Sequence, residues 1–215
     1  MNPIHYDLTR FDAAIVDLDG TMVDTLGDFA VSLNHMLGDL SLPPVAPAAI
    51  EKMVGKGSEH LILSALAHVM SSGGAVPGSA DAEVLHARAQ ALFDQAWERY
   101  QHHYLAINGQ HSAVYPGVIE GLKALRSRGL RLACLTNKPT SFAKPLLAAK
   151  GLDGFFDFAF GGDAFARKKP DPLPLLKTCE ALGTAPARTL MIGDSSNDAK
   201  AARAAGCPVV LVTYG

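Results

Sequence analysis

Two aspartates separated by one leucine, Asp17 and Asp19, have the spacing that first suggests chemistry in this chain. They follow residues 13–16, an apolar run rich in β-branched side chains that predicts the end of a buried strand. Side chains two positions apart on an extended chain point to the same side, so we expect both carboxylates to face one way. At about 4 Å and an effective dielectric of about 20 they repel by about 4 kcal/mol, which a divalent cation would relieve. The alternative is a plain acidic turn, because Asp-Gly pairs often only close turns.

Other polar side chains follow two further predicted strands. Thr136 and Asn137 come at the end of the strand predicted over 130–136, and Asp194 follows the strand predicted over 189–192. The carboxyl ends of parallel strands meet at one edge of a sheet, which is where such sheets bind ligands. We therefore expect these residues to converge with the two aspartates.

This set of residues suits phosphoryl transfer. Asp17 could attack phosphorus and form an aspartyl-phosphate, which divides one difficult step into two. Asp19 could protonate the leaving oxygen and then activate water as a base. Thr136 and Asn137 could donate hydrogen bonds to phosphoryl oxygens. Alternatively, Thr136 or Asn137 could cap the following helix, a role compatible with phosphate binding.

A lysine and two more acids complete the candidate site. Lys169, held between a lysine and a proline, could meet the charge of the transferring group, although a Lys-Lys pair is ordinarily a solvated loop. Asp194 could bind Mg²⁺, which prefers carboxylate and carbonyl oxygens. Asp198, one helical turn on, could orient Asp194, Lys169 or a metal-bound water. The alternative for both acids is a helix amino terminus with a favourable charge.

The elements that must position these residues alternate between strands and helices. Strands are predicted over 12–17, 130–136, 155–160, 189–192 and 208–212, and helices over 118–128, 139–150, 171–182 and 196–205. A single helical insertion, from about 24 to 111, interrupts this order after the first strand. The pattern predicts an α/β fold with a parallel sheet and helices on both faces.

Composition narrows the function class. The chain has 215 residues, 48% of them hydrophobic and 19% charged, and a formal net charge of −2. It therefore offers no basic face for nucleic acid. No apolar run is long enough to cross a membrane, and the first ten residues lack the apolar core of a signal peptide. Its three cysteines, an odd number among apolar neighbours, fit reduced thiols, so we expect a cytoplasmic protein.

The four segments 17–21, 135–137, 169–170 and 193–198 resemble, in order and spacing, the motifs of the haloacid dehalogenase superfamily. The resemblance implies a Rossmann-like catalytic core over 1–23 and 112–215, with a helical cap over 24–111. It implies Mg²⁺ held by Asp17, the backbone carbonyl of Asp19, and Asp194. The second acid, Asp19, argues against the dehalogenase branch, and Gly20 against the phosphonatase branch. A phosphatase or a phosphomutase remains.

Further segments resemble the bacterial phosphoglycolate phosphatases within that superfamily: 54–57, 115–118, 136–139, 161–163 and 212–215. This likeness implies hydrolysis of 2-phosphoglycolate, a small phosphorylated metabolite, by a monomer or homodimer. Gly55, Lys56 and Gly57 could then meet the substrate carboxylate, although a loop lysine is usually solvated and relatives often carry asparagine at position 56. Two alternatives stay open: another small phosphomonoester, such as a sugar phosphate or nucleotide, and a catalytically silent binding protein of the same fold.

Overall fold

The computed structural model describes residues 7–71 and 80–215. The loop predicted over 71–80 lies mostly outside these residues, as does the start of the amino-terminal segment. The chain divides into two compact units, one formed by Met1–Val23 and Val114–Gly215 and the other by Asp24–Ala113. Strands β2 (Val23–Asp24) and β3 (Ala113–Val114), which pair with each other, mark the two points where the chain passes between the units.

The first unit is built on a five-stranded parallel sheet with strand order β5-β4-β1-β6-β7. The central strand β1 aligns Val16 with Cys134 of β4 on one side and with Ile192 of β6 on the other. The carboxyl ends of the three central strands are therefore level. The parallel α/β class predicted from the alternation is confirmed. The strands are β1 (Ala13–Val16), β4 (Arg131–Leu135), β5 (Phe158–Phe160), β6 (Thr189–Gly193) and β7 (Val209–Leu211).

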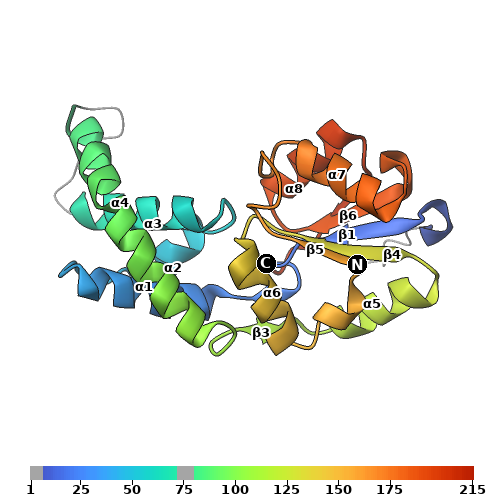
Figure 1. Cartoon of the computed structure of the whole chain (residues 1–215), viewed down its shortest axis with the longest axis horizontal. Coiled ribbons are helices and arrows are strands. Elements are labelled where there is room, and N and C mark those ends of the chain that lie inside the picture. The colour runs from blue at the N-terminus through green and yellow to red at the C-terminus, as the bar shows by residue number, and fades with distance from the viewer. Residues whose placement is uncertain (1–6, 72–79) are drawn as a thin grey trace. The chain divides into compact units, whose positions relative to one another are not determined.

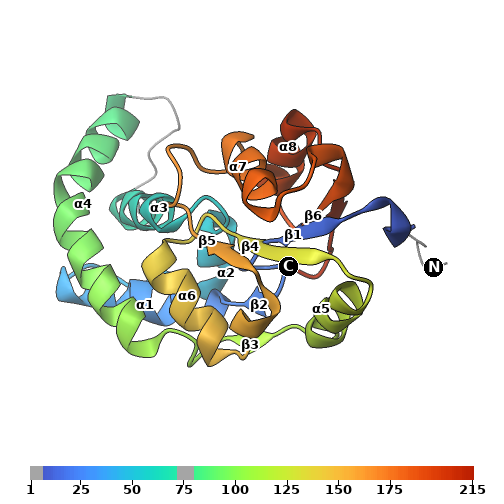
Figure 2. The ribbon, with the colours of Figure 1, turned by 45° about the vertical axis from the view of Figure 1, so that its right-hand side comes forward.

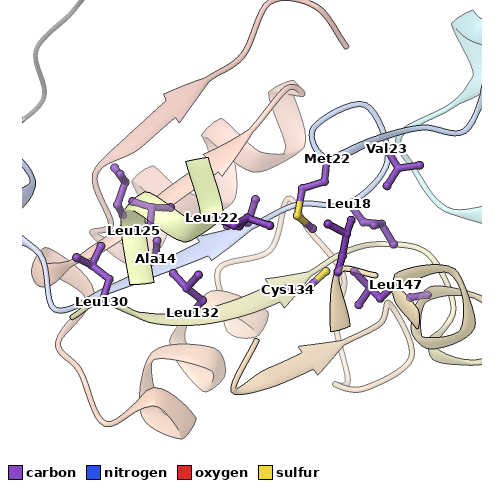
Figure 3. Close-up of a cluster of buried hydrophobic side chains, with 14 of the residues drawn as sticks. Ala14, Leu18, Met22, Val23, Leu122, Leu125, Leu130, Leu132, Cys134 and Leu147 are labelled. Carbon is purple, nitrogen blue, oxygen red and sulfur yellow. The ribbon is translucent and has the colours of Figure 1, made fainter. Parts of the chain in front are cut away.

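Helices cover both faces of this sheet, as Figures 1 and 2 show. Ala14 and Val16 of β1 belong to a hydrophobic cluster with α5 and α6 (Figure 3), whereas Ala13 and Ile15 belong to a second cluster with α7 and α8. Successive strand side chains point to opposite faces, so a strand buried on both faces must be apolar throughout. The helices are α5 (Val118–Ser127), α6 (Thr140–Ala149), α7 (Leu173–Leu182) and α8 (Ser196–Ala205).

Local sequence explains where several of these helices begin and end. Ser195 caps α8, accepting a hydrogen bond from the Asp198 N–H while Asp198 accepts one from Ser195, and Gly206 ends the helix with φ +79°. Helix α7 carries Pro174 in its first turn, where a missing N–H costs little. Helix α6 carries Pro145 in its interior and continues through it.

One predicted strand is shorter than its sequence indicated. The aromatic run from residue 155 predicted a strand over 155–160, but Asp153–Phe155 forms a 3₁₀ turn and β5 comprises only Phe158–Phe160. Asp157, just before β5, accepts a hydrogen bond from the Leu132 N–H of β4 and pairs with Arg126 of α5. The side chain of Asp157 therefore takes a backbone donor at the start of β4. Two further 3₁₀ turns lie at Leu8–Arg10 and Pro186–Arg188.

The second unit is helical. Helix α4 (Ala80–Ile107) packs along α1 (Leu26–Asp39) and α3 (Ser58–Met70), and its Tyr100 and Tyr104 are fully buried. Asp28 of α1 is also fully buried, and its two carboxylate oxygens accept hydrogen bonds from the Gly109 and His111 N–H groups. This carboxylate fastens α1 to the chain that follows α4. Within its described residues, this unit also has a short α2 (Pro47–Ile50) and a 3₁₀ turn (Glu51–Met53).

The sequence also led to predictions about membrane-spanning segments and about the three cysteines. Among the described residues, no helix combines the length and the apolar character needed to cross a bilayer. Cys134, Cys179 and Cys207 are all buried free thiols.

Candidate active site

Asp17 stands at the carboxyl end of β1, where its N–H still bonds the Ile192 carbonyl of β6. The side chain is nearly buried, and its Oδ1 accepts a hydrogen bond of 2.8 Å from the Leu18 N–H. The same oxygen lies 3.0 Å from the Lys169 Nζ. The candidate nucleophile therefore has a fixed orientation, supported by one backbone donor and one buried cation.

Asp194 follows β6 and approaches Asp17 from the neighbouring strand. Thr21 donates a hydrogen bond of 2.7 Å from its hydroxyl to the Asp194 Oδ1. Gly20, with φ +77°, turns the chain beside this carboxylate, and a Cβ there would lie 2.6 Å from the Asp194 Oδ2. Glycine is therefore required at position 20 for two reasons, the left-handed backbone and the close approach of Asp194.

Lys169 lies in the loop between β5 and α7, and it is buried rather than solvated. Its ammonium group contacts three oxygens: the Leu135 carbonyl at 2.8 Å, Asp198 Oδ1 at 2.6 Å and Asp17 Oδ1 at 3.0 Å. An ammonium group has three N–H donors, so these contacts match its full capacity. The alternative of a plain solvated Lys-Lys loop is therefore wrong for Lys169.

Asp198 is fully buried at the first turn of α8 and serves two partners at once. Its Oδ1 accepts the Lys169 bond, while its Oδ2 accepts bonds from the N–H and the hydroxyl of Ser195. A Cβ at Gly193 would lie 2.5 Å from the Asp198 Oδ2, so position 193 must be glycine for α8 to begin here. Asp198 therefore contacts both the start of α8 and Lys169, so its two interpretations, as part of a helix cap and as a partner that orients Lys169, are compatible.

Thr136 and Asn137 follow β4, but their side chains make contacts that the sequence did not predict. The Asn137 amide donates to the Lys169 carbonyl at 2.8 Å and accepts from the Lys169 N–H at 3.0 Å. The Thr136 hydroxyl oxygen accepts from the Lys138 N–H. Asn137 therefore holds the loop that carries Lys169.

Neither Thr136 nor Asn137 caps α6, so the alternative of a helix cap is wrong. Pro139 occupies the cap position and makes no side-chain capping bond. The Asp163 carboxylate instead accepts a hydrogen bond of 2.8 Å from the first helical N–H, that of Thr140. Asp163 lies 23 positions beyond Thr140 in the chain, so local sequence could not identify this partner.

Asp19 has a partner that sequence reasoning missed. Lys138, from the segment between β4 and α6, donates a hydrogen bond of 2.8 Å from its Nζ to the Asp19 Oδ1. The Lys138 side chain is 1% exposed and the Asp19 side chain 13%. The sequence did contain a signal for this contact. Lys138 lies two positions after Thr136, within a segment already expected at the site.

The pKa values of these acids are shifted in different directions. Burial and the neighbouring Asp198 and Asp194 charges raise the pKa of Asp17 to about 8, although Lys169 opposes them. Burial also raises the pKa of Asp194, against the effect of the Thr21 hydrogen bond. Burial alone would raise the pKa of Asp198, but the charge and hydrogen bond of Lys169 outweigh it and lower that pKa.

Lys169 is correspondingly held in its charged form. Burial alone would lower its pKa, but the Asp17 and Asp198 carboxylates outweigh burial and raise it. Two buried lysines, Lys169 and Lys138, face four carboxylates at this site, and a bound metal ion would relieve the surplus of negative charge.

The residues present fit a metal ion. Carboxylate oxygens of Asp17, Asp194 and Asp198 all lie within 4.8 Å of one another, and this set of oxygen donors could hold a divalent cation. Asp198 already engages Lys169 and Ser195 through both oxygens, so Asp17 and Asp194 are the better carboxylate ligands. The Asp19 side chain is not part of this cluster.

The three remaining candidates belong to the helical unit. Gly55, Lys56 and Gly57 form the loop before α3, with Gly55 at φ +99° and Gly57 at φ +93°. Lys56 is exposed. The two positive φ values account for both glycines without reference to a ligand, so the substrate contact expected for this loop stays a prediction.

Known proteins resemble this chain over most of its length. A family model described as haloacid dehalogenase-like hydrolase matches residues 11–206. The phosphoglycolate phosphatase of Thiobacillus denitrificans is 43% identical over 203 residues, which cover 94% of this chain and 83% of that protein. The phosphoglycolate phosphatase of Nitrosospira multiformis is 41% identical over 212 residues, 99% of this chain and 87% of that protein.

Solved structures show the same fold. The crystal structure of a predicted phosphoglycolate phosphatase from Haemophilus somnus has a TM-score of 0.84 and 34% identity, covering 96% of this chain and 87% of that one. A structure described as a β-phosphoglucomutase from Thermotoga maritima has a TM-score of 0.70 at 21% identity, covering 95% of this chain and 87% of that one. The second likeness concerns the fold alone.

Proposed function

Because the chain belongs to the haloacid dehalogenase-like hydrolases, we propose that it hydrolyses 2-phosphoglycolate to glycolate and phosphate through an aspartyl-phosphate at Asp17. One observation carries this proposal. The Asp17 carboxylate lies within 4.8 Å of the Asp194 carboxylate and 3.0 Å from the Lys169 Nζ, so all three side chains can reach one phosphoryl group. Relatives named phosphoglycolate phosphatase, at about two-fifths identity over most of the chain, support the choice of substrate.

The first chemical step belongs to Asp17 and Asp19. Asp17 forms a bond to phosphorus as the bond between phosphorus and the glycolate oxygen breaks, and Asp19 delivers a proton to that oxygen. Lys169, fixed by Asp198 and the Leu135 carbonyl, stabilises the negative charge that develops on the phosphoryl group.

The second step regenerates the enzyme. Asp19, now a carboxylate, takes a proton from water as the water oxygen bonds to phosphorus and the Asp17–phosphate bond breaks. Thr136 and Asn137 lie at the adjacent strand end. We infer that Thr136 takes part in binding the phosphoryl oxygens and that Asn137 acts mainly by holding the Lys169 loop.

We propose Mg²⁺ as the metal, held by Asp17, Asp194 and the backbone carbonyl of Asp19. Hard oxygen donors and a surplus of negative charge favour Mg²⁺ over softer ions. Mg²⁺ would neutralise charge on the bound phosphate and on the crowded carboxylates. Three buried free thiols favour a reducing compartment, so we infer a cytoplasmic enzyme, monomeric or homodimeric.

A substrate panel tests the proposed function. Phosphate release is measured with 2-phosphoglycolate, p-nitrophenyl phosphate, β-glucose 1-phosphate and a nucleoside monophosphate, each with Mg²⁺ and with chelator. We expect the highest kcat/KM for 2-phosphoglycolate, loss of release in chelator and recovery on adding Mg²⁺. A higher kcat/KM for another compound overturns the substrate, and conversion of the sugar phosphate to its isomer indicates a mutase. Binding of Mg²⁺ without phosphate release from any compound indicates a silent binding protein.

The role proposed for Gly55, Lys56 and Gly57 is recognition of the substrate carboxylate by the helical unit acting as a cap. Lys56→Ala should lower turnover of 2-phosphoglycolate relative to p-nitrophenyl phosphate, which has no carboxylate. Lys52→Ala, at an exposed lysine of the preceding 3₁₀ turn, is the matched control. An unchanged ratio in Lys56→Ala removes Lys56 from substrate selection.

A further inference from the structure

We propose that Lys138 is a positioning residue for the acid–base carboxylate of Asp19, and that it determines which Asp19 oxygen handles the proton. This inference rests on the proposed function, because it assigns a partner to the acid of that reaction. Its basis is the 2.8 Å contact between Lys138 Nζ and Asp19 Oδ1, made between residues 119 positions apart in the sequence.

The segment that carries Lys138 is held firmly. The Lys138 N–H donates to the Thr136 hydroxyl oxygen at 3.1 Å, and its carbonyl accepts from the Gly162 N–H at 2.8 Å. A Cβ at Gly162 would lie 2.3 Å from the Asn137 carbonyl oxygen, so the 161–162 turn lies directly against this segment. The backbone of Lys138 is thus fixed on both sides, and its side chain reaches Asp19 from a defined origin.

The two buried lysines of this site serve different acids. Lys169 contacts Asp17 and Asp198, whereas the Lys138 ion pair is with Asp19. A buried ion pair contributes little net stability, because loss of hydration offsets the attraction between its charges. A second buried lysine is therefore better explained by orientation of the Asp19 carboxylate than by stability alone.

The orientation has a chemical consequence. The Lys138 ammonium donates to Oδ1, and we assign the proton that Asp19 exchanges to Oδ2. In the first step that proton passes from Oδ2 to the glycolate oxygen as its bond to phosphorus breaks. In the second step Oδ2 takes a proton from the attacking water. Lys138 donates a hydrogen bond to Asp19 and transfers no proton in either step.

Two substrates with different leaving groups distinguish this positioning role of Lys138 from a merely structural one. Glycolate leaves as a basic alkoxide unless it is protonated, whereas p-nitrophenolate leaves without a proton. With enzyme in excess over substrate, glycolate formation and p-nitrophenol release each report the first step alone. We expect Lys138→Met to slow glycolate formation by about 10²-fold, the lower end for general acid catalysis, and p-nitrophenol release by less than about threefold.

Controls and a second variant keep the outcome decisive. Lys144→Met, at an exposed lysine of α6, should change neither rate. Lys138→Gln, which keeps a side-chain N–H donor, serves if Lys138→Met does not fold, and glycolate formation should again slow more than p-nitrophenol release. In an Asp19→Asn background, Lys138→Met should slow glycolate formation no further. Equal slowing of both substrates overturns the inference while leaving the proposed function intact. Failure of the unaltered enzyme to form glycolate overturns the proposed function itself.

Discussion

Two buried aspartates, one in each unit, are used in opposite ways. Asp28 of the helical unit gives its two oxygens to backbone N–H groups at 2.9 and 2.7 Å, those of Gly109 and His111. Asp17 of the sheet unit accepts one backbone N–H, and its other neighbours are Lys169 and two more carboxylates. Burial of a carboxylate therefore does not mark a functional site. A functional site is marked instead by like charges that face one another, because their repulsion does not stabilise the fold.

A similar contrast holds between Ser32 of the helical unit and the two buried lysines of the sheet unit. In the helical unit, Ser32 donates its hydroxyl to the Asp28 carbonyl within its own helix. In the sheet unit, Lys138 and Lys169 each reach an acid that is distant in sequence. Asp28 and Ser32 of the helical unit thus bond to backbone groups, whereas the two lysines of the sheet unit bring together carboxylates from distant parts of the chain at one end of the strands.

The same substitution at the two aspartates gives the largest expected difference. Asp17→Asn should lower kcat for 2-phosphoglycolate by at least about 10⁴-fold, because it removes the nucleophile. Asp28→Asn should leave kcat per folded molecule unchanged. Steady-state phosphate release in excess Mg²⁺ measures both. Wild-type turnover by Asp17→Asn would remove Asp17 from the chemistry.

Lys169→Met should have the next largest effect on turnover. It removes the cation that stabilises the transferring group, so we expect kcat to fall by about 10²–10³-fold. Loss of one partner from a buried ion pair should also lower the free energy of unfolding by about 3–5 kcal/mol in metal-free protein. Phosphate release and urea unfolding in chelator measure the two effects. Wild-type turnover by Lys169→Met would argue that Lys169 does not touch the reacting group.

Asp28→Asn should act on stability alone. An amide at this position places one N–H₂ against a backbone donor, which leaves a buried group unsatisfied and costs about 1–3 kcal/mol. Urea unfolding gives the loss, with Asp39→Asn, on the exposed end of the same helix, as the control. A loss of turnover without a loss of stability would contradict the purely structural role of Asp28.

The smallest expected effect concerns the pH dependence of stability without metal. The pKa of Asp17 is raised to about 8 in the folded protein from an ordinary value of 3.8. Between these pH values the folded protein holds a proton that the unfolded chain releases, so this group makes the fold less stable as pH rises. In chelator, the Tm advantage of Asp17→Asn over wild type should therefore grow from pH 5 to pH 8. An advantage that shrinks over this range would contradict the assignment.

Sequence predicted what depends on local pattern. Apolar runs located β1 and β6, and the helix predicted over 196–205 matches α8. The alternation of predicted strands and helices indicated the α/β class. A parallel sheet of that class brings the carboxyl ends of its strands to one edge, which predicted where the site residues meet. The aromatic residues before β5 misled, because Phe155 and Phe156 pack against the first hydrophobic cluster from a turn rather than from a strand.

Sequence could not predict what depends on long-range pairing. The Lys138–Asp19 and Asn137–Lys169 contacts join residues 119 and 32 positions apart, and no local propensity encodes either. Hydrogen bonds of this kind depend on the finished sheet. The residue types at the site were therefore predictable, whereas the division of work between its two buried lysines required the structure.

Chemical trapping of the phosphorylated enzyme tests the central claim most directly. Enzyme turning over 2-phosphoglycolate in Mg²⁺ is quenched in acid and reduced with borohydride, which converts an aspartyl-phosphate to homoserine detectable by mass spectrometry. We expect homoserine at position 17, dependent on both substrate and Mg²⁺, and none in Asp17→Asn. Phosphate release with no homoserine at position 17, or with the modification at another residue, would contradict the account.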